Sequence, residues 1–366
     1  MTDTLRLGYD ARYIRVDHHD GISRFSSRIG SELHALVKDE PNISLTFLIN
    51  DERQLRHLPE QVHYKLISSP TSARERQVAR QVNRFGFDTV FSPMQTMGSR
   101  GKKYRLVLTV HDLIYYRHPM PPRSFAWPIR LLWRLYHLSW WPQRWLLNAS
   151  DAVVAVSATT KSLIAEHHLT QRPVFVVHNA AETLPKVAPI QRTPSLVYMG
   201  SFMPYKNVET LIAAVQLLPG YTLHLLSRIH PVDRARLSKL DTNSQAVFYD
   251  GVTEEEYATA LSGALCAVSA SLDEGFGIPV IEAMAAGTPV VCSDIPIFKE
   301  VAGDAAIFVG AQDSVGFATA ISSLESQAQF EARSSAGLRQ ASTFNWQKSA
   351  RELLDVLIQV SAKPLR

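Results

Sequence analysis

The chain has 366 residues, 46% of them hydrophobic, with a formal net charge of +4 and two cysteines. This length exceeds one ordinary core and predicts two domains of roughly 150–180 residues, each with a well-buried interior. Cys266 and Cys292 lie in apolar runs. They exclude a disulfide-stapled framework, so we expect small core residues in a protein of a reducing compartment.

Neither a targeting segment nor a spanning segment is evident. The amino terminus lacks a charged stretch followed by a long apolar one, and no run of about 18 apolar residues occurs. We therefore expect a cytoplasmic protein, or one peripheral to the inner face of the cell membrane. Nucleic acid is not an expected partner, because basic residues form no stripe beyond residues 123–147.

Short runs rich in Val, Ile and Leu alternate with helical patterns, which is typical of parallel sheets covered by helices. In chain order, the first half has expected strands at 5–11, 44–50, 62–68, 88–93, 105–112, 152–157 and 174–180. The second half repeats the scheme at 195–201, 221–227, 245–251, 266–271, 289–294 and 306–310. We predict an α/β protein with two doubly wound, Rossmann-like domains in tandem.

A Pro-rich stretch without periodicity separates the two halves and predicts a linker. The expected boundaries are residues 1–182 for the first domain, 183–194 for the linker and 195–343 for the second domain. Residues 344–366 are expected to form a closing helix.

Residues 123–147 combine four arginines with five of the six tryptophans. Interfacial helices have this composition, so the segment is a candidate for contact with an anionic membrane. The alternative is a helix whose Trp and Leu side chains pack in a core while its arginines are solvated. Pro128 and Pro142 interrupt the segment, and its apolar residues spread around the helix, which leaves both interpretations open.

The most informative stretch runs from Glu274 to Glu282, where a Gly-x-Gly turn leads into a helix. Such a turn exposes backbone N–H groups at a helix N-terminus, where an anion such as phosphate is favoured. The two glutamates can accept hydrogen bonds from hydroxyl groups. Phosphate beside hydroxyls describes a nucleotide sugar, whereas a dinucleotide fingerprint would need a third glycine where Val280 stands.

Other polar residues also follow strands. His111 and Asp112 end one expected strand, Ser157 ends the next, and Gly200 ends the first strand of the second half. In doubly wound sheets ligands bind at the carboxyl ends of the strands. We expect these loops to gather around one cleft between the domains.

Five ordered motifs together resemble a family 4 glycosyltransferase of the GT-B architecture. They are Asp10-Ala-Arg with Gly21-Ile-Ser-Arg24-Phe, His111-Asp-Leu, Val156-Ser-Ala-Thr-Thr160, Gly200 through Lys206-Asn207, and Glu274 through Glu282. Within the family the pattern is similar to bacterial mannosyltransferases and rhamnosyltransferases of surface-polysaccharide assembly. The resemblance implies an acceptor-side first domain and a second domain that binds the nucleotide sugar.

Three residues are expected to carry the reaction. Lys206 would neutralise the departing diphosphate as a point charge. By resemblance, Glu274 would hold sugar hydroxyls beside the reacting carbon, and His111 would contact the transferred sugar across the cleft. The plainer alternative for His111 is a histidine that only bonds backbone.

The other expected donor-binding residues come from both halves. Gly21 and Arg24 would lie in a loop over the diphosphate, and Glu282 would bind the ribose unless it is a helix-surface glutamate. Ser201 stands where family members commonly carry an arginine, so Arg228 is a possible substitute cation. The remaining candidates are Asn207, Val252, Gly275, Phe276, Gly277 and Ile278.

No Asp-x-Asp pair occurs in the chain, and we expect neither a metal nor another cofactor. His18 and His19 lie between Asp17 and Asp20, but adjacent residues rarely reach one ion, so a polar loop is expected there. The implied reaction is retaining transfer of a hexose to a glycan or lipid-linked acceptor, with mannose from GDP-mannose as the leading donor. The alternatives are a UDP or dTDP sugar such as rhamnose, a phosphorylase, and a non-catalytic module that binds nucleotide sugars.

Overall fold

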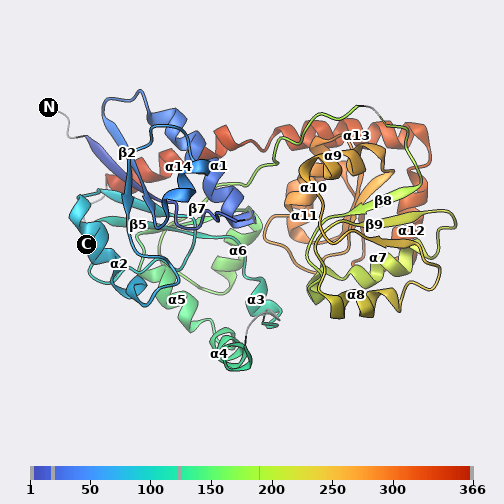
Figure 1. Ribbon diagram of the computed structural model, residues 1–366, viewed down its shortest axis with the longest axis horizontal. Helices are drawn as coiled ribbons and strands as arrows, with labels where there is room; N and C mark the ends of the chain where they lie inside the picture. Colours follow the sequence, from blue (N-terminus) through green and yellow to red (C-terminus); the bar gives the residue numbers. More distant parts are fainter. Residues whose placement is uncertain (1–3, 18–20, 122–125, 189, 363–366) are drawn as a thin grey trace. The chain divides into compact units, whose positions relative to one another are not determined.

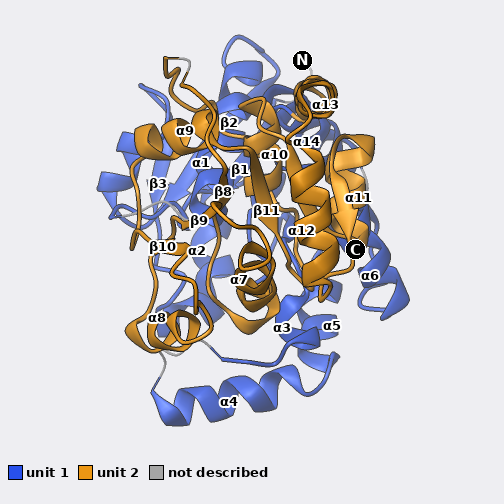
Figure 2. Cartoon of the chain, turned by 90° about the vertical axis from the view of Figure 1, so that its right-hand side faces the viewer, with its two compact units in different colours: residues 1–179, 345–366 blue, residues 180–344 orange. Residues whose placement is uncertain are grey.

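The structure is a computed structural model that describes residues 4–17, 21–121, 126–188 and 190–362. The chain divides into two compact units. Unit 1 comprises residues 1–179 and 345–366, and unit 2 comprises residues 180–344 (Figure 2). The predicted linker, residues 183–194, lies in unit 2.

Unit 1 contains a seven-stranded sheet in the order β3-β2-β1-β4-β5-β6-β7, and every neighbouring pair is parallel (Figure 1). The strands are β1 (Leu5–Asp10), β2 (Ile43–Ile49), β3 (Tyr64–Leu66), β4 (Thr89–Ser92), β5 (Arg105–Val110), β6 (Ala152–Ala155) and β7 (Val174–Val176). The helices are α1 (Gly21–Val37), α2 (Val78–Val82), α3 (Ile114–Arg117), α4 (Trp127–His137), α5 (Trp141–Asn148), α6 (Ala158–Glu166) and α14 (Trp346–Ser361). Short 3-10 helices are η1 (Glu52–His57), η2 (Ala73–Gln77) and η3 (Asn83–Phe85).

Unit 2 contains a six-stranded parallel sheet in the order β10-β9-β8-β11-β12-β13. Its strands are β8 (Ser195–Tyr198), β9 (Thr222–Leu225), β10 (Ala246–Phe248), β11 (Cys266–Ser269), β12 (Val290–Ser293) and β13 (Ile307–Val309). Its helices are α7 (Val208–Val215), α8 (Pro231–Ser238), α9 (Glu254–Gly263), α10 (Ile278–Ala285), α11 (Pro296–Ala302), α12 (Ser314–Ser323) and α13 (Gln327–Ser342), with 3-10 turns η4 (Pro204–Lys206) and η5 (Gly303–Ala305).

The predicted strands and the two-sheet α/β class are confirmed, and the burial of the strands explains why. All residues of β5, β8 and β12 are buried, as expected for parallel strands covered by helices on both faces. Cys266 and Cys292 are fully buried, and burial raises the pKa of both thiols. Both cysteines are therefore inert core residues, as predicted.

One predicted loop is wrong. Residues 21–24 form the first turn of α1, because Phe25, Ile29 and Leu33 recur every four residues and are buried against the sheet. The turn is fixed by Ser23, whose Oγ accepts a hydrogen bond of 2.8 Å from the backbone N–H of Arg15. The predicted His18–Asp20 loop lies outside the described residues.

The predicted closing helix is α14, which packs beside α1 and contacts β4 and β5 (Figure 1). Its buried face comprises Ser349, Ala350, Leu353, Val356, Leu357 and Val360. The Ser349 hydroxyl donates a bond of 2.7 Å to the carbonyl of His178. The last helix of the chain thus completes the core of unit 1.

Packing in a core is overturned for residues 127–137, whereas Leu147 at the end of the segment is fully buried in a core cluster that Trp140 packs against. The segment forms α4 and α5, each with proline in its first turn. None of the residues of α4 is buried, and Trp127 is 75% exposed. Aromatic contacts attach α4 to the rest of unit 1. Trp133 of α4 lies edge-on to Tyr115, and Trp140, which follows the helix, stacks on Tyr116 at 4.3 Å. Among the described residues, no helix is both long and apolar enough to cross a membrane.

Candidate functional site

The loops that carry the predicted donor-site residues lie along one edge of the unit 2 sheet. Because β8, β9, β10 and β11 are parallel and adjacent, the loops that follow them meet at their carboxyl ends. These loops contain Lys206, Arg228, Val252 and Glu274 respectively.

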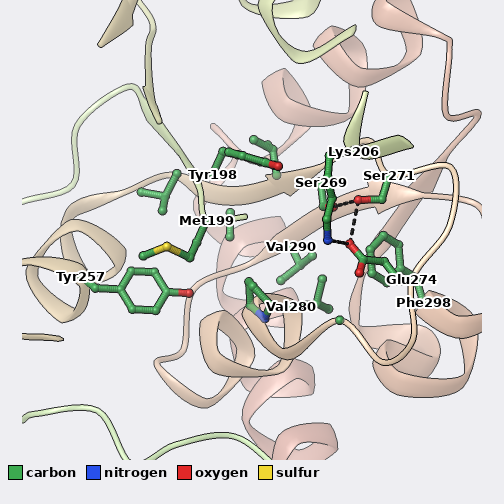
Figure 3. A pocket seen from close by; sticks show the side chains of 15 residues that line it. Tyr198, Met199, Lys206, Tyr257, Ser269, Ser271, Glu274, Val280, Val290 and Phe298 are labelled. Carbon is green, nitrogen blue, oxygen red and sulfur yellow. Dashed lines mark hydrogen bonds and ion pairs between the residues drawn. The ribbon is translucent and has the colours of Figure 1, made fainter. Parts of the chain in front are cut away.

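Lys206 and Glu274 form an ion pair at this edge (Figure 3). The Lys206 Nζ lies 2.5 Å from Glu274 Oε1, and the side chains are only 15% and 12% exposed. The Ser271 hydroxyl donates a second bond, of 2.8 Å, to the same oxygen. A cavity of about 20 Å³, lined by both charged residues, lies against the pair, with room for about one water molecule. The structure thus brings two of the three predicted catalytic residues together.

Asn207, next to Lys206 in the chain, helps to position this pair. Its backbone has φ = 50°, a left-handed conformation that Asn tolerates better than most residues. Its side-chain amide donates to the carbonyls of Ala270, at 3.2 Å, and Ala311, at 2.6 Å. Since Ala270 begins the loop that carries Glu274, Asn207 fixes the two charged loops against each other.

The turn before α10 requires glycine at Gly277, which is the N-cap of the helix with φ = 90°. A Cβ there would lie 2.7 Å from the Phe298 ring. Phe276 is buried edge-on to Phe344 at 5.6 Å. These contacts hold the first turn of α10, beginning at Ile278, in an orientation where its N–H groups favour an anion.

Glu282 lies on α10 and is only 3% exposed. The alternative of a helix-surface glutamate is therefore wrong. A carboxylate is rarely buried without a reason, and its position one helix turn beyond the anion-favouring N-terminus is compatible with the predicted ribose contact, which stays a prediction.

Three further candidates border the same edge. Ser201 is exposed, and its carbonyl accepts a bond of 2.6 Å from the Tyr198 hydroxyl. Arg228 is exposed and lies over Gly251, where a Cβ would come 3.0 Å from Arg228 Cγ. Val252 follows Gly251 directly. Their roles toward a donor, like that of Gly275, stay predictions.

In unit 1, His111 directly follows β5 and donates from Nε2 to the carbonyl of Pro93 at 2.7 Å. Its ring lies edge-on to Phe25, 4.9 Å away between centroids. Because Phe25 follows Arg24 in the first turns of α1, the structure brings His111, Gly21 and Arg24 to the same end of the sheet. The backbone bond that the plainer alternative expected is present, and it also fixes the ring in place.

A buried charge cluster lies at this end of the sheet, formed by Asp10 and Arg12 of the first motif with Glu75, which the sequence did not indicate. Arg12 contacts Asp10 at 2.7 Å and Glu75 at 2.6 Å. Burial alone would lower the pKa of Arg12, but the charges and hydrogen bonds of Asp10 and Glu75 outweigh it and raise that pKa. Burial raises the pKa of Glu75, against the opposing effect of Arg12.

The residues that sequence reasoning missed are Ser271 and Glu75. Ser271 had a weak signal, since it precedes Glu274 by three residues in the same loop. Glu75 had none, because it lies in a charged, aperiodic stretch far from the motifs. Among the described residues, no group of three His, Cys, Asp or Glu side chains could hold a metal ion.

Solved structures share this fold over nearly the whole chain. Sucrose-phosphate synthase from Thermosynechococcus elongatus superposes with a TM-score of 0.73 at 16% identity, covering 98% of this chain and 99% of that one. Anabaena HepE, in complex with UDP and glucose, superposes with a TM-score of 0.69 at 15% identity, covering 97% and 99%. The fold is that of the GT-B glycosyltransferases.

Two family models match consecutive parts of the chain, Glycosyltransferase Family 4 over residues 45–183 and Glycosyl transferases group 1 over residues 181–340. The chain therefore belongs to the family 4 glycosyltransferases.

Two O-antigen enzymes are among the similar proteins. The O-antigen chain mannosyltransferase RfbU of Salmonella typhimurium is 28% identical over 60% of this chain and 60% of its own length. The O-antigen chain mannosyltransferase B of Escherichia coli is 27% identical over 69% of each. The alignment with RfbU thus spans less than two thirds of that relative.

Proposed function

We propose that the chain is a retaining glycosyltransferase that moves a hexose from a nucleoside-diphosphate sugar to a glycan or lipid-linked acceptor. Mannose from GDP-mannose is the leading donor, supported by the names of the two O-antigen relatives. The observation that carries the proposal is the Lys206–Glu274 pair beside the N-terminus of α10. The site combines a lysine ammonium, a carboxylate and a helix dipole in the part of the chain that the group 1 family model matches.

The chemistry follows from an exchange of partners. An arriving diphosphate is attracted to the α10 N-terminus and competes with Glu274 for the Lys206 ammonium. Once Lys206 turns to the phosphate, Glu274 can accept hydrogen bonds from the sugar hydroxyls. The negative charge that grows on the leaving phosphate then meets Lys206, with Arg228 as a second cation.

Retention requires the acceptor to attack from the face that the diphosphate leaves. The acceptor hydroxyl forms the new bond to the anomeric carbon as the bond to the phosphate oxygen breaks, and that oxygen takes the proton. No enzyme nucleophile is needed. His111 and the first turn of α1, with Gly21 and Arg24, contribute contacts to the sugar and phosphate from unit 1.

Metal independence belongs to the same proposal, supported by the lack of an Asp-x-Asp pair in the sequence and by a lysine placed to neutralise phosphate. Transfer that is unchanged by EDTA is the expected result. Activity lost with EDTA and restored by Mg²⁺ or Mn²⁺ would contradict it.

The direct test is Lys206→Ala and Glu274→Ala, each measured for transfer from radiolabelled GDP-mannose. Removing one group that stabilises charge in the transition state lowers kcat by about 10²–10³-fold. The matched control is Lys299→Ala, which breaks an ion pair of 2.6 Å to Asp294 whose members are largely exposed and should retain activity within about twofold. Full transfer by either site variant would overturn the proposal.

Two alternatives keep specific support. A UDP or dTDP sugar is favoured by HepE, which was solved with UDP and glucose. A non-catalytic module is favoured by Ser201, an exposed hydroxyl where the family commonly places an arginine. Thermal stabilisation by GDP, UDP and dTDP separates the donors. Nucleotide binding without transfer or hydrolysis of any nucleotide sugar would favour the module, and phosphate-dependent release of a sugar phosphate would indicate a phosphorylase.

A peripheral membrane contact through α4 is the second part of the proposal. The exposed face of α4 carries Trp127, Leu131, Leu132 and Leu135, and its charged side chains are Arg130 and Arg134. A helix that is apolar toward solvent and purely cationic suits an anionic lipid surface. The proposal is that the protein binds the cytoplasmic face of the membrane, and the composition of α4 supports the lipid contact.

Flotation with phosphatidylglycerol vesicles tests the contact. The variant Trp127→Ser/Leu131→Ser/Leu135→Ser should lose binding, whereas Val315→Ser, an exposed apolar residue of unit 2, should not. Trp140 is a poor target because it stacks between Tyr116 and His167. Equal flotation by both variants would remove the membrane contact from the proposal.

A further inference from the structure

A pocket of about 1040 Å³ in unit 1 lies outside the donor site. Its walls come from η2 with α2, from the loop after β4 and from α5. Arg76, Arg80 and Arg100 line it together with the apolar side chains of Trp145 and Leu146. The pocket therefore combines three cations with an apolar side.

The walls are held together by buried polar contacts. Glu75 accepts from Arg12 and from the backbone N–H of Gly98 at 3.1 Å. A Cβ on Gly98 would overlap the Glu75 carbonyl oxygen at 2.1 Å, so only glycine lets the loop come this close. The Gln143 amide of α5 donates to Gln95 at 2.9 Å. The pocket is thus formed before any ligand arrives.

The charge of the pocket is unbalanced. Glu75 is the only carboxylate among the lining residues, and it is already bonded to Arg12. Within the described part of the chain, Arg76, Arg80 and Arg100 form no ion pair. Three guanidinium groups in a concave site attract phosphate, which their planar donors bind in pairs.

The apolar side of the pocket indicates a ligand in which an apolar chain is joined to the anionic group. Trp145 is 62% exposed, and the neighbouring Trp141 on α5 is exposed as well. The exposed face of α4 precedes them in the chain and stands clear of the sheet (Figure 1). Exposed apolar side chains that share a pocket with three cations match an amphiphile, not a free anion.

The loop that forms one wall also reaches the predicted sugar site. It begins at Pro93, whose carbonyl accepts the bond from His111, and it contains Arg100, which lines the pocket. A ligand phosphate in the pocket would therefore be one loop away from His111.

We propose that the Arg76–Arg80–Arg100 pocket binds the phosphate or diphosphate head of a lipid-linked acceptor, with the first part of its chain along Trp145 and Leu146. The proposal rests on the proposed transferase function and specifies its acceptor. The binding itself is measurable without catalysis.

The probe is farnesyl diphosphate, titrated by calorimetry into the full chain carrying Lys206→Ala, which weakens competing binding at the donor site. Arg76→Gln/Arg80→Gln should weaken binding at least about tenfold, because charge-assisted hydrogen bonds to the phosphate are lost. Trp145→Ala should weaken it about fivefold, because an aromatic contact with the apolar chain is lost. Arg84→Gln, on η3 outside the pocket lining, is the matched control and should stay within about twofold.

Inorganic diphosphate and farnesol should each bind at least about tenfold more weakly than farnesyl diphosphate, because each offers only half of the contacts. Equal binding of inorganic diphosphate, or farnesyl diphosphate binding unchanged in Arg76→Gln/Arg80→Gln, would overturn the proposal. Loss of phosphatidylglycerol flotation in that variant with farnesyl diphosphate binding intact would assign the arginines to the bilayer instead. Stabilisation of the wild type by GDP, measured separately, shows whether the donor function stands when the acceptor pocket fails.

Discussion

Two charge clusters lie at the carboxyl ends of the two sheets, and they differ in how easily their ion pairs can separate. In unit 1, Arg12 is bonded to Asp10 with both side chains wholly buried, and Asp10 accepts a further bond from Ser92. In unit 2, the Lys206–Glu274 pair is slightly exposed and rests on one ammonium with a flexible stem. Arginine and its carboxylates act as a fixed brace, whereas the lysine pair can separate when a competing anion arrives.

Burial and donor geometry therefore decide whether an ion pair is fixed or can exchange partners. A guanidinium bound on two sides by carboxylates cannot leave without exposing buried charge. A lysine can rotate toward a new partner and leave its carboxylate bonded to Ser271. A fixed ion pair and an exchangeable one can thus be built from the same kinds of charge.

The largest expected loss of stability comes from Arg12→Met, which removes the buried ion pairs of unit 1. Removing one partner of a buried ion pair costs about 3–5 kcal/mol of unfolding free energy, because Asp10 and Glu75 are left without it. Chemical denaturation measures the loss. Lys206→Met should cost clearly less, since its carboxylate keeps the Ser271 bond, and an equal loss in both variants would erase the distinction.

The turn beside the lysine pair is tested by Gly277→Ala. The left-handed φ and the approach to Phe298 predict a loss of about 1–3 kcal/mol. Adding Phe298→Leu should recover part of this loss by removing the close contact, but not the part that is due to φ. Complete recovery would show that backbone conformation contributes nothing there.

The exchange at Glu274 is tested by Ser271→Ala. If Ser271 holds the carboxylate while Lys206 binds phosphate, its removal should lower kcat/KM by about threefold to tenfold, the worth of one hydrogen bond. Ser269→Ala is the matched control, because Ser269 reaches Ser271 at 3.2 Å and contacts Glu274 only through it. A larger effect from Ser269→Ala would contradict the assignment.

The smallest effect concerns the attachment of α4. Burial lowers the pKa of His137, outweighing its bond to the Trp133 carbonyl. The packed ring therefore prefers to be neutral, and its contribution is complete above the ordinary pKa of 6.5 and falls as the pH drops through the lowered value. Below pH 6, amide exchange in residues 127–138 should accelerate by about twofold to tenfold, corrected for intrinsic rates. His137→Gln should abolish that dependence.

Sequence patterns predicted the strands, the α/β class and the Glu274–Glu282 turn, because apolar runs and glycines reflect local requirements. They could not show that Lys206 bonds Glu274, since that contact depends on loops held by Asn207 from a distance. They also left α4 undecided, because a helix that is apolar on most sides suits both a core and a lipid surface. The Arg76 pocket had no local signal, as its walls come from three separate segments.

The return of α14 to unit 1 has a consequence for biosynthesis. Unit 2 is continuous in sequence, whereas unit 1 lacks a helix of its core until residues 346–361 have been translated. On the ribosome, the first sheet must therefore wait, with α1 uncovered, while the second unit is made and can fold. The segment translated first is the one completed last, so chaperones would meet an unfinished amino-terminal half throughout synthesis.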